Sequence, residues 1–98
     1  MGNSLKSAQF LIESRLRDAM MGKGPACFEL GMVYSTGSGG TDIDLIEAHK
    51  WFNLAALYGD ERAAEWRTEI AEDMTAREIV EAQKAARAII QMSQARAA

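Results

Sequence analysis

The chain has 98 residues, 48% of them hydrophobic, which is enough for one domain with one modest core and too little for a two-domain enzyme. Eleven Lys and Arg stand against 14 Asp and Glu, so the chain lacks the positive surface of a protein that grips nucleic acid phosphates or anionic membranes. No apolar run reaches the roughly 20 residues that cross a bilayer. Residues 1–21 carry charges unlike the centre of a signal peptide, and a single Cys excludes an internal disulfide. We therefore expect a cytoplasmic protein with no nucleic acid partner and no membrane insertion.

Helices are predicted along almost the whole chain. Pro25 is the only proline, and apolar residues recur every three or four positions, whereas no segment alternates for long with a period of two. In chain order, the predicted helices cover residues 4–21, 25–36, 44–58, 60–73 and 75 to near the end. Because the connections are short, successive helices should run antiparallel. The predicted fold class is all-α, with about five antiparallel helices.

Local signals mark where these helices begin and end. Gly22 and Gly59 follow helical segments, and Pro25 suits a first helical position. Asp44 and Thr75 each stand three residues before a glutamate, the spacing of a capping box. The positions expected to face the core are, helix by helix, Leu5, Ala8, Ile12, Leu16 and Ala19; Ala26, Leu30, Val33 and Tyr34; Leu45, Ala48, Trp51, Phe52 and Ala55; and Ile79, Ala82, Ala86, Ile89 and Ile90.

The sequence repeats weakly with a period of 37 residues. This shift superimposes Ala19 on Ala56, Gly22 on Gly59, Ala26 on Ala63 and Cys27 on Ala64. The repeated unit is a helix pair punctuated by glycine. Each pair leaves an apolar face that only the next pair can cover, so the pairs should stack.

One stretch of the chain resembles a known repeat. The residues that make the likeness are Ala26, Leu30, Gly31, Tyr34, Gly37, Gly39, Asp44, Ala48, Trp51, Phe52, Ala55, Ala56, Gly59 and Ala63. They resemble the signature of the Sel-one-like repeat, a relative of the tetratricopeptide repeat, over roughly residues 22–64. The chain departs from the pattern at Gly40, where the family has Val. The resemblance implies a short αα-superhelix, or tetratricopeptide-like solenoid, in which Gly31 and the alanines let paired helices approach closely.

The resemblance divides a single helical domain, residues 1–98, into three parts. Residues 1–24 align as an N-terminal capping helix, residues 25–60 as the complete helix pair, and residues 61–98 as a partial repeat with a C-terminal capping helix. Arg67 stands where the repeat has Leu. At least three repeats usually make a stable solenoid, so either the last helix contributes strongly to the core or the chain pairs with another.

Cys27 and His49 are the only cysteine and the only histidine, so they are the one Cys-His nucleophile pair to consider. Structural roles are favoured. Cys27 lies beside Ala26 on an apolar helix, and His49 lies beside the Trp-Phe pair on a face expected to be half-exposed. A catalytic role requires one of them to lie in an accessible pocket beside a partner group, and we expect no catalytic residue.

The glycine-rich segment 36–42 looks superficially like a phosphate cradle. It lacks the Walker lysine and does not follow a strand, so it is predicted to be a helix connection. Asp42 and Asp44 lack the spacing of a calcium loop, and Asp44 is explained as a helix cap. We therefore expect no cofactor and no metal ion.

Acidic residues concentrate between positions 60 and 81, where eight stand against three basic residues. Three of them share one helix face, and the positions 37 residues earlier include two large apolar side chains. Because the first helix of each pair lines the concave surface of such solenoids, these positions predict an apolar patch beside an acidic rim; a plain solvated surface is the alternative. The six predicted partner-binding residues are Phe28, Met32, Ser35, Glu65, Glu69 and Glu72. Such a surface suits a basic amphipathic segment.

The resemblance implies a non-enzymatic protein-protein interaction module, an adaptor or scaffold that binds a peptide or helix of a partner protein on its concave face. One alternative is a self-associating structural or regulatory subunit, whose unfinished faces stack into a homodimer. A third is a small-molecule hydrolase, because hydrolysis has been linked to some Sel-one-like proteins.

Overall fold

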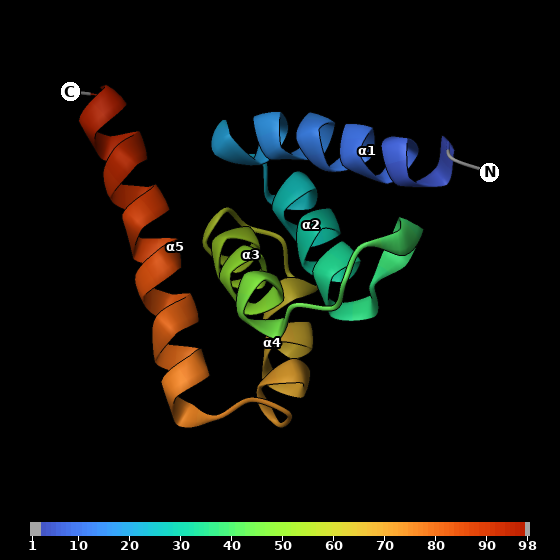
Figure 1. Ribbon diagram of the computed structural model, residues 1–98. Helices are drawn as coiled ribbons and strands as arrows, with labels where there is room; N and C mark the ends of the chain where they lie inside the picture. The colour runs from blue at the N-terminus through green and yellow to red at the C-terminus, as the bar shows by residue number, and fades with distance from the viewer. Residues whose placement is uncertain (1–2, 98) are drawn as a thin grey trace.

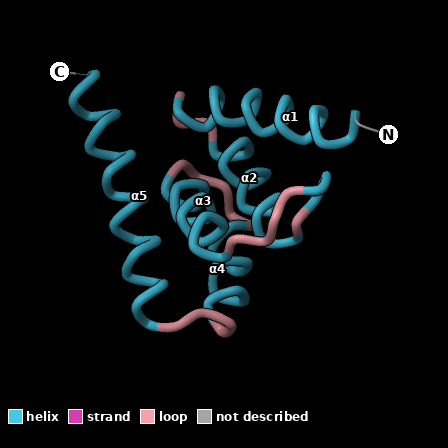
Figure 2. The backbone as a smooth tube through the Cα atoms, viewed as in Figure 1, coloured by secondary structure: helices cyan, strands magenta, loops and turns pink. Residues whose placement is uncertain are grey.

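The computed structural model describes residues 3–97, and this part of the chain holds five α-helices, one short 3-10 helix and no strand. The elements are α1 (Asn3–Met20), α2 (Gly24–Thr36), η1 (Ser38–Gly40), α3 (Leu45–Leu57), α4 (Ala63–Ala71) and α5 (Ala76–Ala97). Loops and turns connect them (Figure 2). The all-α prediction is confirmed. Over the same residues, none of the helices combines the length and the apolar character needed to cross a membrane.

Helix α3 lies in the middle of the fold. It packs against α2, α4 and α5, and α1 packs against α2 (Figure 1). Helices α4 and α5 run in opposite directions and are joined by a short turn at the bottom of the view in Figure 1. The radius of gyration is 13.2 Å, close to the roughly 13 Å of a compact chain of this length. The position of α3 leaves it little free surface.

The contact between α2 and α3 depends on a glycine. A Cβ atom on Gly31 would lie 2.4 Å from ring atoms of Phe52, so any side chain there would collide with the ring. The Phe28 and Phe52 rings lie 5.7 Å apart between centroids at a tilt of 49°, a favourable aromatic arrangement. The close approach predicted at Gly31 is therefore confirmed.

The predicted helix caps are present. The backbone N–H of Glu47 donates to Oδ1 of Asp44 at 3.1 Å at the start of α3. At the start of α5, the Thr75 N–H donates to Glu78 Oε1 at 2.8 Å, and the Glu78 N–H donates to Thr75 Oγ1 at 3.1 Å. Each bond satisfies an amide that lacks a partner within the first turn of its helix.

Helix α4 begins at Ala63, three residues later than predicted. The carboxylate of Asp60 accepts the Arg62 backbone N–H at 3.1 Å and two guanidinium N–H groups at 3.0 and 2.7 Å. These bonds hold residues 60–62 as a turn. The hydrogen bonds from Arg62 also lower the pKa of Asp60 below its ordinary value.

Helices α1 and α3 end in the same way, 37 residues apart. The Gly22 N–H donates to Ala19 O at 3.0 Å and the Lys23 N–H to Asp18 O at 3.2 Å. At the end of α3, the N–H groups of Gly59 and Asp60 donate to Ala56 O and Ala55 O at 3.1 and 2.9 Å. Both glycines have positive φ, 83° and 92°, as this helix ending requires. Each bond in one set thus has its counterpart 37 positions along.

The buried residues cover more of the surface of these helices than the single apolar stripe that was predicted for each helix. The side chains buried in it are Ala19, Ala26, Cys27, Phe28, Leu30, Ala48, Trp51, Phe52, Leu54, Ala55, Ala63, Ile70 and Ala86. Phe28 and Leu54 are not among the predicted core positions, whereas the structural role favoured for Cys27, a small buried thiol that packs like alanine, agrees with its burial. The predictions for Leu5 and Ala8 lie outside the residues whose side chains are described. On α2 and α3, the buried surface is wider than the periodicity predicted.

Candidate functional site

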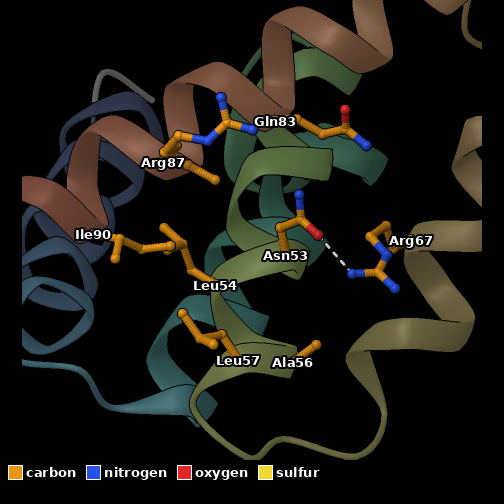
Figure 3. Close-up of a pocket in the computed structure, with 9 residues that line it drawn as sticks. Asn53, Leu54, Ala56, Leu57, Arg67, Gln83, Arg87 and Ile90 are labelled. Carbon is orange, nitrogen blue, oxygen red and sulfur yellow. Dashed lines mark hydrogen bonds between the residues drawn. The ribbon is translucent and has the colours of Figure 1, made fainter.

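A cleft of about 620 Å³ opens between α3, α4 and α5. Its lining residues are Asn53, Leu54, Ala56, Leu57, Arg67, Gln83, Ala86, Arg87 and Ile90 (Figure 3). They come from all three helices, because α4 and α5 both pack on α3. Pockets that gather apolar surface and a few polar groups from several elements are the usual binding sites of proteins. This cleft is therefore the candidate functional site.

One part of the cleft is apolar. Leu54 is buried at its base, Ile90 is partly exposed, and Leu57 is 59% exposed. In Figure 3 these three side chains lie on the same side of the cleft. Leu57 is the last residue of α3 and precedes the turn that ends this helix. An apolar side chain this exposed at the edge of a cleft offers surface that a ligand can cover.

The other part of the cleft is polar and positively charged. A guanidinium N–H of Arg67 donates to Oδ1 of Asn53 at 2.5 Å. Gln83 and Arg87 come from α5, and Asn53 lies between them and Arg67 in Figure 3. No Asp or Glu lines the cleft. Among the side chains that the structure describes, neither arginine is paired with a carboxylate.

His49, one turn of α3 before Asn53, lies within the electrostatic reach of Arg67. Its side chain is 4% exposed, and its Nδ1 has no hydrogen-bond partner within the described part of the chain. Burial, followed by the positive charge of Arg67, lowers the pKa of His49 below its ordinary value. Both effects favour the neutral form of the histidine. The half-exposed position predicted for it is wrong, because α3 is surrounded on several sides.

Sequence reasoning noted Arg67 but did not place it in a site. Arg67 stands 37 residues after Leu30, which is 1% exposed in the core. A partly buried arginine thus occupies the place of a core leucine in the preceding helix pair. Replacing an apolar residue by a charged one inside a helix contact normally destabilises the fold, so such an exception is a signal of function. The arginine at the position equivalent to Leu30 is therefore the sequence signal that could have indicated the cleft.

The predicted partner-binding surface takes a different form in the structure. Phe28, expected to line an open apolar patch, is 8% exposed. It packs on Phe52, and the guanidinium carbon of Arg62 lies 3.9 Å from the centroid of its ring. Arg62 comes from the turn between α3 and α4, which the helical periodicity of α2 could not reveal. Phe28 is a core residue covered by a cation, and this corrects the expectation of an exposed aromatic side chain.

The other five predicted residues lie at or near the surface. Met32 and Ser35 are partly exposed on α2, and the Ser35 hydroxyl donates to the Met32 carbonyl at 3.1 Å. Glu65, Glu69 and Glu72 are exposed on α4 and at its C-terminal end. The partner-binding role of these residues stays a prediction.

Cys27 and His49 are both buried, at 0% and 4% exposure. Desolvation raises the pKa of the Cys27 thiol to about 11, and the thiol donates weakly to the Ala19 carbonyl at 3.8 Å. A thiol of this kind is a poor nucleophile near neutral pH. The accessible group that a Cys-His hydrolase needs is not provided by either residue. Within the described residues, no three His, Cys, Asp or Glu side chains gather where they could hold a metal ion.

Comparison of the chain with protein-family models, with curated proteins and with solved structures found no match. The resemblance to the Sel-one-like repeat therefore rests on the residues of this chain alone.

Proposed function

We propose that this chain is a non-enzymatic protein-interaction module of the helical-repeat type, which binds a segment of a partner protein in the cleft between α3, α4 and α5. The observation behind the binding role is the cleft itself, which combines the exposed Leu57 with two guanidinium groups that pair with no carboxylate of the described residues. A segment of another protein could cover the apolar part and satisfy the polar part together. Such a pairing of apolar contact and oriented polar groups is typical of interaction sites.

Two features support the repeat architecture within this proposal. At the helix endings of Gly22 and Gly59, the hydrogen bonds donated by each glycine and by the residue after it correspond at a spacing of 37 residues. The glycine contact at Gly31 brings α2 and α3 together as the Sel-one-like resemblance implies. Repeats of this kind present extended surfaces to partners.

The test is site-specific photocrosslinking in the cell of origin. A photoreactive amino acid replaces Leu57 at the cleft, Glu69 on the predicted acidic surface, or Val80 on α5 as a control that is 47% exposed and does not line the cleft. We expect a discrete protein adduct at position 57 and none at position 80. An adduct at position 69 alone would move the docking site to the surface predicted from sequence. Without an adduct at any position, the interaction role fails.

Self-association is a second candidate, favoured by the surface of α1. Phe10 is 73% exposed and Leu11 is 44% exposed on this helix. Adjacent apolar side chains this exposed suit a contact between two copies. Light scattering over a range of concentrations should then show a dimer that Phe10→Ser dissociates, whereas a monomer at all concentrations eliminates this candidate.

A further inference from the structure

The polar wall of the cleft has more hydrogen-bond donors than acceptors. A guanidinium carries five N–H donors, and within the described residues Arg67 uses a donor only toward Asn53. Arg87 is exposed on α5, and its guanidinium makes no hydrogen bond or ion pair with the described residues. The cleft thus presents positive charge and free donors with no carboxylate among its lining residues. It is complementary to an anion that accepts hydrogen bonds.

Partly burying the charge of Arg67 destabilises the fold unless another group pairs with its guanidinium. The equivalent residue in α2, Leu30, is in the core, and Arg67 is partly buried. A carboxylate is the natural compensating group, because it accepts two parallel N–H bonds from one guanidinium. The four ion pairs found among the described side chains lie elsewhere: Arg15–Glu29, Lys23–Asp18, Lys50–Glu47 and Arg62–Asp60. No described side chain supplies a carboxylate to Arg67, so this position is open to one from a ligand.

We propose that the ligand of this cleft is an acidic, amphipathic segment of a partner protein. An Asp or Glu of the segment pairs with Arg67, and a second acidic residue of the segment faces Arg87. An apolar side chain next to the first acidic residue covers Leu54, Leu57 and Ile90. This inference rests on the proposed interaction role and gives it a chemical specificity. It is opposite in charge to the basic partner expected for the surface with Glu65, Glu69 and Glu72.

The shape of the cleft favours a protein segment over a small acid. Small-molecule sites typically bury 70–90% of the ligand, roughly speaking, inside an enclosed pocket. Here Leu57 stands 59% exposed at the edge, so a bound group would be covered on one side only. A peptide gains binding energy from such a one-sided surface by extending along it. The segment therefore lies across the cleft, with its acidic residue toward α4.

The experiment is a selection of random displayed peptides, roughly 12 residues long, on the immobilised full chain. We expect enriched peptides with Asp or Glu next to Leu, Ile or Phe. Binding of a selected peptide, measured by fluorescence anisotropy, should weaken at least about tenfold in Arg67→Gln, as expected when a charge-assisted hydrogen bond is lost. Circular dichroism establishes whether this variant folds.

Two further variants, each with a matched control, keep the test independent of the folding of Arg67→Gln. Arg87→Gln changes an exposed cleft residue and should weaken the peptide severalfold, whereas Arg77→Gln removes the same charge from α5 outside the cleft and should leave affinity unchanged. Leu57→Asp should abolish binding through repulsion of the acidic peptide. Val80→Asp, a matched change at another exposed apolar residue, should not.

The following outcomes would contradict the proposal of an acidic ligand. Enrichment of basic peptides, or equal loss of affinity in Arg87→Gln and Arg77→Gln, overturns the assignment of an acidic segment to this cleft while leaving the interaction role intact. If no peptide is enriched and photocrosslinking also finds no partner, the interaction role itself fails together with this inference. The two failures are therefore distinguishable.

Discussion

The helix pairs α2–α3 and α4–α5, equivalent under the 37-residue shift, pack differently: α2 packs extensively on α3, whereas α4 and α5 pack mainly on α3 and scarcely on each other. Between α2 and α3, Gly31 admits the Phe52 ring and Leu30 is buried, so the pair closes completely. Between α3, α4 and α5, Arg67 stands at the position of Leu30 and a cleft of about 620 Å³ stays open. At these equivalent positions, a buried leucine accompanies a closed helix contact, whereas an arginine lines an open cleft.

The largest effect is expected from exchanging the residue types at this pair of positions. Leu30→Arg buries an unpaired charge in the core, and a cost of about 4 kcal/mol or more should unfold so small a domain. The reciprocal change, Arg67→Leu, should raise the free energy of unfolding by roughly 1 kcal/mol, because an apolar side chain then fills part of the cleft. Urea unfolding followed by circular dichroism measures both. Equal effects at the two positions would contradict the difference between the pairs.

A second test concerns the close approach of α2 and α3. Gly31→Val places a branched side chain where even a Cβ would lie 2.4 Å from Phe52, so we expect a loss of about 3 kcal/mol in stability. Thr68 stands 37 residues after Gly31 and is exposed. Thr68→Val is the matched control and should change stability by no more than about 0.5 kcal/mol. A Gly31→Val protein that melts at the wild-type temperature would show that the contact is not tight.

A third comparison concerns Cys27 and Ala64, which are equivalent under the 37-residue shift, and it can be made by measuring thiol reactivity. With its pKa raised to about 11 from 9.0, Cys27 has roughly a hundredfold less thiolate than an exposed cysteine at about pH 8. Its reaction with a disulfide reagent should be slower by at least that factor and should become fast in denaturant. A Cys27→Ala, Ala64→Cys protein places the thiol at an exposed position of α4 and should react rapidly. Similar rates for the two folded proteins would refute the burial of Cys27.

The smallest effect concerns the pH dependence of stability. The folded chain holds the pKa of His49 below the ordinary 6.5, first through burial and then through the charge of Arg67. The unfolded chain therefore binds a proton more readily, so this contribution to stability is complete above about pH 6.5 and is lost as the pH falls through the folded pKa. His49→Leu should flatten the loss, as unfolding over a pH series would reveal. Arg67→Leu should raise the pKa of His49, measured by NMR titration; an unchanged value would separate His49 from the cleft.

Much of the fold could be predicted because its signals are local. The cap at Asp44, the capping box at Thr75 and the glycine endings at Gly22 and Gly59 depend on hydrogen bonds between residues three to five positions apart. Such bonds form in the same way wherever the helix lies in the molecule. The late start of α4 escaped prediction because the Asp60 carboxylate binds the Arg62 guanidinium, a turn that competes with helix.

The burial of side chains could be predicted only in part. One inward stripe was expected for α3, but α3 has α2, α4 and α5 around it, so Leu54 and His49 on its other faces are also buried. Phe28 is covered by Arg62, which lies 34 residues further along the chain. The cleft needs residues from three helices at once, and no spacing within one helix announces it.

The helices, most of their ends and the 37-residue repetition could be read from the sequence, because each follows from propensity and from hydrogen bonds between near neighbours. The tertiary structure alone decided which faces of these helices are covered, since exposure depends on residues distant in the chain. In the folded chain, the Arg62 side chain covers Phe28, whereas Arg67 and Leu57 line an open cleft. The same helical pattern thus became core in one pair and a candidate binding site in the other.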